Sequence, residues 1–170
     1  MDRNAYLNAK FGGAERAAEI YSRIGEVGQS VGIDFRFDLI KTTPNTIQAH
    51  RLICFAQRPE YACGDAIIQA LFEAYFLKGM NIGDDAVLID IAKTAGLDAA
   101  SVKAYLEGEE DRDDIVAEDI FARRLGINGV PCFIVDGKFS LSGAQEPESF
   151  LPLFDLSAEE MRQAPESAAV

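Results

Sequence analysis

Apolar residues recur at intervals of three and four through most of the first 125 residues, which predicts a mainly helical chain. The clearest case is residues 14–31, a predicted helix that ends at Gly32. Similar patterns predict helices over residues 46–57, 64–78, 84–95, 99–106, 113–125 and 147–156. Phe72, Tyr75 and Phe76 form an aromatic stripe on one of them, and we expect this stripe to belong to the core.

Two short runs near the C-terminus have the pattern of strands. Cys132–Val135 is apolar and rich in β-branched residues, and Lys138–Ser142 alternates polar and apolar residues. The dipeptide Asp136-Gly137 between them is a strong hairpin signal, because both turn positions require a positive φ. Pro131 has no N–H group, so it fits the residue that opens a strand. The pattern therefore predicts a β-hairpin entered through a proline.

Ile33–Leu39 also alternates strictly, which predicts an extended segment that could form a third strand. Two strands alone do not make a stable sheet, and this segment is the only internal candidate to pair with the hairpin. A strand edge without a partner invites pairing with another chain. We therefore expect a homodimer or larger homo-oligomer, in which a second copy covers the hairpin or Ile33–Leu39.

Composition and charge narrow the functional classes. The 170 residues, 48% hydrophobic and 26% charged, predict one soluble globular domain over residues 1–170. A net charge of −12 disfavours nucleic acid and anionic membranes as partners. No apolar run approaches the roughly 20 residues that span a bilayer, and residues 1–5 lack a signal-peptide pattern. We expect a cytoplasmic protein with neither a membrane nor a nucleic-acid partner.

The cysteines point away from disulfides and metal. Cys54, Cys63 and Cys132 form neither a disulfide framework nor a C-x-x-C motif, so three free thiols are expected in a reducing cytosol. His50 is the only histidine, so the chain lacks the usual ligand set of a zinc site. We expect no metal and no cofactor.

Five segments together resemble the DsbA-like thioredoxin superfamily. They are Y-L-N-A-K-F-G-G from Tyr6, G-I-D-F-R-F-D-L-I from Gly32, P-N-T-I-Q-A-H-R-L from Pro44, L-F-E-A-Y-F-L-K-G-M-N-I from Leu71 and G-V-P-C-F-I-V-D-G-K-F-S-L-S-G-A-Q from Gly129. The resemblance runs over residues 6–154 and is strongest to the FrnE-type branch of dithiol-disulfide isomerases. That branch neighbours the 2-hydroxychromene-2-carboxylate isomerases and kappa-class glutathione transferases.

The resemblance implies an α/β, DsbA-like thioredoxin fold that is predominantly helical. Residues 14–126 would be mainly its helical insertion, residues 127–156 the cis-proline β-hairpin with the final helix, and residues 163–170 a tail. In this family a strand and a C-P-W-C-type motif precede the segment that here starts at Tyr6. Met1 stands directly before that segment, so we expect the N-terminal βαβ portion to be missing, through a misassigned start or a shortened product.

By lineage the function would be that of a thiol–disulfide oxidoreductase or isomerase. A nucleophilic cysteine needs a lowered pKa and a second thiol to resolve the mixed disulfide, and a C-x-x-C motif supplies both. We therefore expect this chain to be inactive in exchange. The alternatives are a non-catalytic module that binds glutathione, a peptide or a partner, and a glutathione-dependent isomerase or transferase. The expected partners are a dithiol or disulfide protein, or glutathione as substrate or ligand.

Two residues are candidates for chemistry. Cys132 follows Pro131, which resembles the cis-proline of the family, so its thiol could act as a surrogate near the redox centre. A small buried hydrophobe in a strand is the simpler interpretation of Cys132. His50 could serve as a proton shuttle or substrate contact, or could pack on its helix with a local hydrogen bond.

Substrate binding is expected at three short segments. Val130 and Pro131 would offer backbone groups to an extended peptide or to glutathione. Asn45 and Thr46 resemble cleft residues that hold the tripeptide in relatives, and either could instead cap the helix that follows. The third segment, Gly143, Ala144 and Gln145, resembles a γ-glutamyl contact or forms an ordinary strand-to-helix turn.

Overall fold

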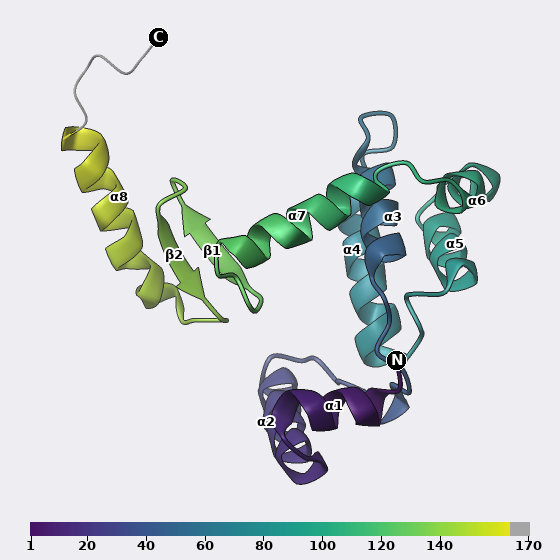
Figure 1. Ribbon diagram of the computed structural model, residues 1–170, viewed down its shortest axis with the longest axis horizontal. Coiled ribbons are helices and arrows are strands. Elements are labelled where there is room, and N and C mark those ends of the chain that lie inside the picture. The colour runs from purple at the N-terminus through teal and green to yellow at the C-terminus, as the bar shows by residue number, and fades with distance from the viewer. Residues whose placement is uncertain (164–170) are drawn as a thin grey trace. The chain divides into compact units, whose positions relative to one another are not determined.

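The structure is a computed structural model that describes residues 1–163 (Figure 1). The chain divides into two compact units, residues 1–117 and the residues from 118 onward. Helix α7 (Arg112–Arg124) contains the boundary between them. Each unit is described by itself.

The first unit is helical. Its elements are α1 (Arg3–Phe11), α2 (Ala14–Ser30), the 3₁₀ turn η1 (Phe37–Leu39), α3 (Ile47–Gln57), α4 (Gly64–Phe72), the π-helical turn η2 (Glu73–Leu77), α5 (Asp85–Thr94) and α6 (Ala99–Glu107). The helices predicted at residues 14–31, 46–57, 84–95 and 99–106 are confirmed. The helix predicted over residues 64–78 is α4 continued by the π turn, in which the Lys78 N–H bonds to the Glu73 carbonyl five residues back.

The core of the first unit lies among α3, α4, α5 and α6. Each of these helices contributes one side chain that is fully buried: Leu52, Ile67, Leu88 and Val102. Packing of four amphipathic helices around shared apolar side chains is the main source of stability in an all-helical unit.

A buried arginine joins α3 to the end of α6. Arg51 is 0% exposed, and its guanidinium donates to the backbone carbonyls of Tyr105, Leu106 and Glu110 at 2.7, 2.9 and 2.8 Å. Its Nη1 also donates to the Gln48 side chain at 2.7 Å. The last carbonyls of a helix have no partner within the helix, so this side chain satisfies acceptors that would otherwise be buried without a donor.

Ile33–Leu39 does not form the expected strand. The backbone N–H of Ile33 donates to the Gly28 carbonyl at 2.8 Å and that of Arg36 donates to the Phe76 carbonyl at 2.8 Å, so these donors bond to helix ends. Phe35 and Phe37 stack with ring centroids 5.0 Å apart and pack around Phe76. The alternation of the sequence therefore reflects aromatic packing against helices and not a pleated sheet.

The second unit contains the predicted hairpin. β1 (Cys132–Val135) pairs antiparallel with β2 (Phe139–Ser142), with Cys132 opposite Ser142 and Val135 opposite Phe139. Asp136 and Gly137 in the turn have φ values of 51° and 67°, as an Asp-Gly turn requires. Within the described residues this sheet has two strands.

A C-terminal helix packs on the hairpin. The 3₁₀ turn η3 (Pro147–Phe150) leads into α8 (Leu151–Gln163), which runs seven residues past the predicted end of this helix. Phe150 meets Phe133 edge to face with ring centroids 4.9 Å apart. Lys138 in the turn bonds to Glu160 at 2.6 Å, and the Ser157 hydroxyl bonds to the Asp136 carboxylate. Most of the tail predicted at residues 163–170 lies outside the described residues.

Candidate functional site

The predicted site residues fall into two groups, one in each unit. Asn45, Thr46 and His50 belong to the first unit, and the remaining six lie in the second. Within the second unit, the hairpin brings Pro131, Cys132, Gly143 and Gln145 together, although the sequence separates them by up to fourteen positions.

The loop that enters β1 is the most exposed part of the second group. The Val130–Pro131 peptide bond is cis, and Val130 is 90% exposed. The Pro131 carbonyl accepts a 2.8 Å hydrogen bond from the Gly143 N–H, which extends the hairpin pairing by one step. The Pro131 carbonyl is therefore held in place, whereas the backbone of Val130 is accessible to an extended chain.

Cys132 begins β1 and is half-buried. The hydroxyl of Ser142, its partner across the hairpin, lies 4.0 Å from the Cys132 sulfur. The thiol borders a shallow cavity of about 250 Å³, together with Ile127, Ile134 and Ser140. A thiol in this position can form a mixed disulfide, but no other cysteine lies in the second unit to resolve it.

The loop after β2 is a turn stabilised by its own side chain. Gly143 has a φ of 85°, in the region that favours glycine, and Gln145 Nε2 donates to the Ser142 carbonyl at 3.1 Å. Ala144 is exposed. The turn geometry accounts for these residue types, and any ligand contact made by Gly143, Ala144 and Gln145 is additional to it.

In the first unit, the capping interpretation applies to one of the two predicted residues. Asn45 Oδ1 accepts a 3.0 Å hydrogen bond from the Ile47 N–H at the start of α3. Thr46 occupies the N-cap position by its backbone, and its side chain makes no capping hydrogen bond. Thr46 instead lines a cavity, and so does His50 one turn further along α3.

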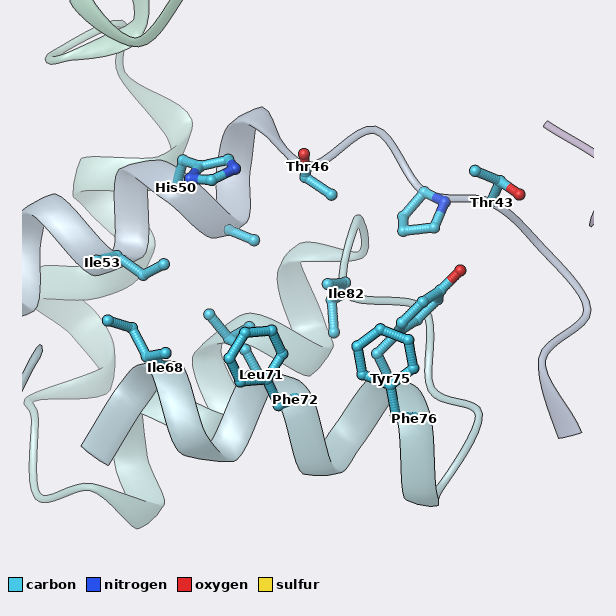
Figure 2. A pocket seen from close by; sticks show the side chains of 12 residues that line it. Thr43, Thr46, His50, Ile53, Ile68, Leu71, Phe72, Tyr75, Phe76 and Ile82 are labelled. Carbon is cyan, nitrogen blue, oxygen red and sulfur yellow. The ribbon is translucent and has the colours of Figure 1, made fainter. Parts of the chain in front are cut away.

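This cavity lies between α3 and α4 and has a volume of about 310 Å³ (Figure 2). Ile53 from α3 faces Ile68 and Leu71 from α4 across it, and Phe72, Tyr75 and Phe76 complete the wall. The interpretation of these three aromatic residues as core is wrong, because Phe72 is 57% exposed and the other two are half-buried.

The sequence gave no indication of the cavity, because a helical stripe of this kind is usually covered by its own fold. One signal was present in the polar residues around the stripe. Arg3 is 7% exposed, and its Nη1 donates to the Tyr75 hydroxyl at 2.9 Å. Burial raises the pKa of Tyr75 above its usual value, against the opposing charge of Arg3. The Tyr75 hydroxyl is therefore a fixed, protonated group at one end of the wall.

Two further findings concern metal and membrane. Among residues 1–163, no three His, Cys, Asp or Glu side chains come together in a way that could hold a metal ion. Over the same residues, no helix has both the length and the apolar character needed to cross a bilayer.

Comparison with known proteins identifies the family. The model of the DSBA-like thioredoxin domain matches residues 3–154. YwbO, an uncharacterized protein of Bacillus subtilis strain 168, is 30% identical over 128 residues. This match covers 75% of the present chain and 62% of YwbO, so the chain spans less than two thirds of that relative.

Two solved structures agree with the family model. A probable DsbA oxidoreductase from Streptomyces coelicolor superposes with a TM-score of 0.79 at 29% identity, covering 94% of this chain and 68% of its own. A structure from Nitrosomonas europaea, with a TM-score of 0.67 at 19% identity, covers 86% of this chain and 75% of its own and shows the fold alone. The chain, predominantly helical with a small two-stranded sheet near its C-terminus, belongs to the DSBA-like thioredoxin domain family.

Proposed function

We propose that the protein works in thiol–disulfide exchange, as a relative of the FrnE-type dithiol-disulfide isomerases. The family match over residues 3–154 carries this proposal. The exposed Val130–Pro131 pair directly before the Cys132 thiol supports it, because an accessible backbone beside a sulfur suits a disulfide-bearing chain.

In this proposal the loop binds and the thiols of this chain do not catalyse. Val130 presents its backbone to an extended peptide or to glutathione, and Gly143, Ala144 and Gln145 flank it. Complete exchange requires one thiolate to attack the substrate disulfide and a second thiol to release the mixed disulfide. Cys54, Cys63 and Cys132 form no C-x-x-C pair, so the reacting dithiol is not made by them.

An exchange assay tests this assignment. We would follow reduction of insulin by glutathione with and without the 170-residue chain, and with its Cys132→Ser variant. We expect neither protein to accelerate reduction above glutathione alone. Acceleration by the parent chain that Cys132→Ser abolishes would overturn the assignment and make Cys132 the nucleophile.

The absence of a C-x-x-C pair from the sequence also favours a second function, that of a non-catalytic module binding glutathione or an extended peptide. Titration with oxidised glutathione and with a short disulfide peptide, followed by amide chemical shifts, separates the two. Shifts confined to residues 129–132 and 143–145 would support binding at the loop. No shift at millimolar ligand would exclude it. A glutathione-dependent isomerase or transferase would in addition have to turn over a small-molecule substrate.

A further inference from the structure

The cavity between α3 and α4 has walls made of apolar atoms. None of the residues lining it is Asp, Glu, Lys or Arg. Thr46 turns its methyl group toward the space and its hydroxyl away from it, and the Tyr75 hydroxyl points outward to Arg3 (Figure 2). A ligand here would leave water without gaining a charged or strongly polar partner, which favours a neutral, apolar molecule.

Size and shape narrow the ligand further. A cavity of about 150 Å³ lined by Leu, Ile and Phe holds one benzene ring, and the present cavity is about 310 Å³. Phe72, Tyr75 and Phe76 place aromatic rings along one wall, and aromatic rings pair favourably with other aromatic rings. We propose that this cavity binds a neutral, planar molecule of two fused aromatic rings, the chemical class of indole and naphthalene.

Exposure of Phe72 supports a ligand at this position. Phe72 is 57% exposed while its neighbours Leu71 and Ala74 are 4% and 3% exposed. A large apolar side chain held at the mouth of an apolar cavity gains burial when a ring slides beneath it. The net charge of −12 and the lack of a lining cation act against the anionic derivatives of such rings.

The chain offers two direct readouts. It contains no tryptophan, so the fluorescence of added indole is measured without a protein indole background. His50 is the only histidine and lines the cavity, so its imidazole proton signals are unambiguous in a proton NMR spectrum. A bound aromatic ring should displace these signals through its ring current.

The test is a titration of the full 170-residue chain with indole, followed by both readouts. We expect saturable binding together with a shift of the His50 signals, and binding of indole-3-acetate about tenfold weaker or less. Phe72→Ala should weaken indole binding about tenfold. Phe121→Ala removes a phenylalanine that is 62% exposed and far along the chain on α7, and it should leave binding unchanged.

Ala49→Leu is a second variant that fills the cavity without opening it, since Ala49 lines the space and is 4% exposed. It should abolish binding, and circular dichroism of each variant verifies that its helices are retained. The proposal is overturned by the absence of saturable binding, by binding that leaves the His50 signals in place, or by equal affinity for indole and indole-3-acetate. None of these outcomes bears on the exchange assay, so the two proposals succeed or fail separately.

Discussion

The guanidinium of Arg51 lies 4.8 Å from the ring centroid of Tyr105 and donates a 2.7 Å hydrogen bond to the backbone carbonyl of the same residue. One side chain of α3 thereby holds both the ring and the main chain of a residue near the end of α6. Tyr105 in turn donates from its hydroxyl to Asp111 at 2.6 Å, and Asp111 pairs with Arg58 at 3.3 Å. The end of α6 is thus fixed by a connected set of polar contacts.

Removing Arg51 should therefore be costly. Arg51→Met leaves the carbonyls of Tyr105 and Leu106 buried without this donor, and each such acceptor costs about 1–3 kcal/mol. We expect the free energy of unfolding to fall by about 3–5 kcal/mol in urea denaturation. Arg16→Met, on the exposed surface of α2, should stay within about 0.5 kcal/mol of the parent. A loss for Arg51→Met no larger than that of Arg16→Met would contradict this role.

Tyr105 should make stability depend on alkaline pH. Burial raises the pKa of its hydroxyl well above the ordinary value of 10.0, and the hydrogen bond to Asp111 adds to the effect. The folded state therefore favours the protonated tyrosine, so this stabilisation is complete below about pH 10 and is lost as the pH rises further. Urea midpoints should fall from about pH 9 to about pH 11.

The matched variant is Tyr105→Phe, which should lower stability by about 1 kcal/mol at neutral pH and flatten the alkaline decline. Burial also raises the pKa of Tyr75, so the decline should shrink rather than vanish and should shrink again in the double variant with Tyr75→Phe. An alkaline decline as steep in the double variant as in the parent would show that neither tyrosine causes it.

Two glycines of α2 should respond to alanine with opposite signs. A Cβ at Gly25 would have no heavy atom within 4 Å, and a Cβ at Gly28 would lie 2.5 Å from a ring carbon of Phe35 and 2.8 Å from the Ile33 carbonyl oxygen. We expect Gly25→Ala to stabilise by about 0.5–1 kcal/mol through helix propensity. Gly28→Ala should destabilise by about 1–3 kcal/mol, because the backbone oxygen cannot move aside. Equal effects in thermal unfolding would refute the close packing at Gly28.

Self-association should depend on the hairpin. Both of its strands have an open edge within the described residues, and Phe133 and Ile134 are 40% and 49% exposed. We expect light scattering at micromolar concentration to give a dimer or larger species, and Ile134→Lys to shift it toward monomer. Val116→Lys places the same charge on α7 and should leave the mass unchanged. A monomeric parent chain would rule out this prediction.

The helices could be predicted because their signals are local. α2, α3, α5, α6 and α7 each begin and end within one residue of the positions that periodicity, caps and glycines indicate. The hairpin is local as well, since the Asp136-Gly137 turn sets its register and thereby places Cys132 opposite Ser142. The grouping of Pro131, Cys132 and Gly143 follows from that turn.

What failed depended on contacts distant in sequence. Ile33–Leu39 alternates as a strand does, but its aromatic rings pack on Tyr21 and Phe76 and its backbone bonds to the ends of α2 and the π turn. The cavity depends on how far α3 stands from α4, which no periodicity along either helix reveals. The same stripe pattern would be produced by a helix whose aromatic residues were covered.

The π turn at Glu73–Leu77 divides one helix into two registers. Each residue of an α-helix turns the chain by about 100°, and the bond from Lys78 back to Glu73 accommodates one residue more than the α-helical ladder does. Side chains after the turn are therefore rotated relative to those of α4. Substitutions that adapt the aromatic wall to a new ligand can then accumulate after Phe72 while Ile67 and Leu71 keep their places in the core, so ligand specificity and folding can evolve separately along a single helix.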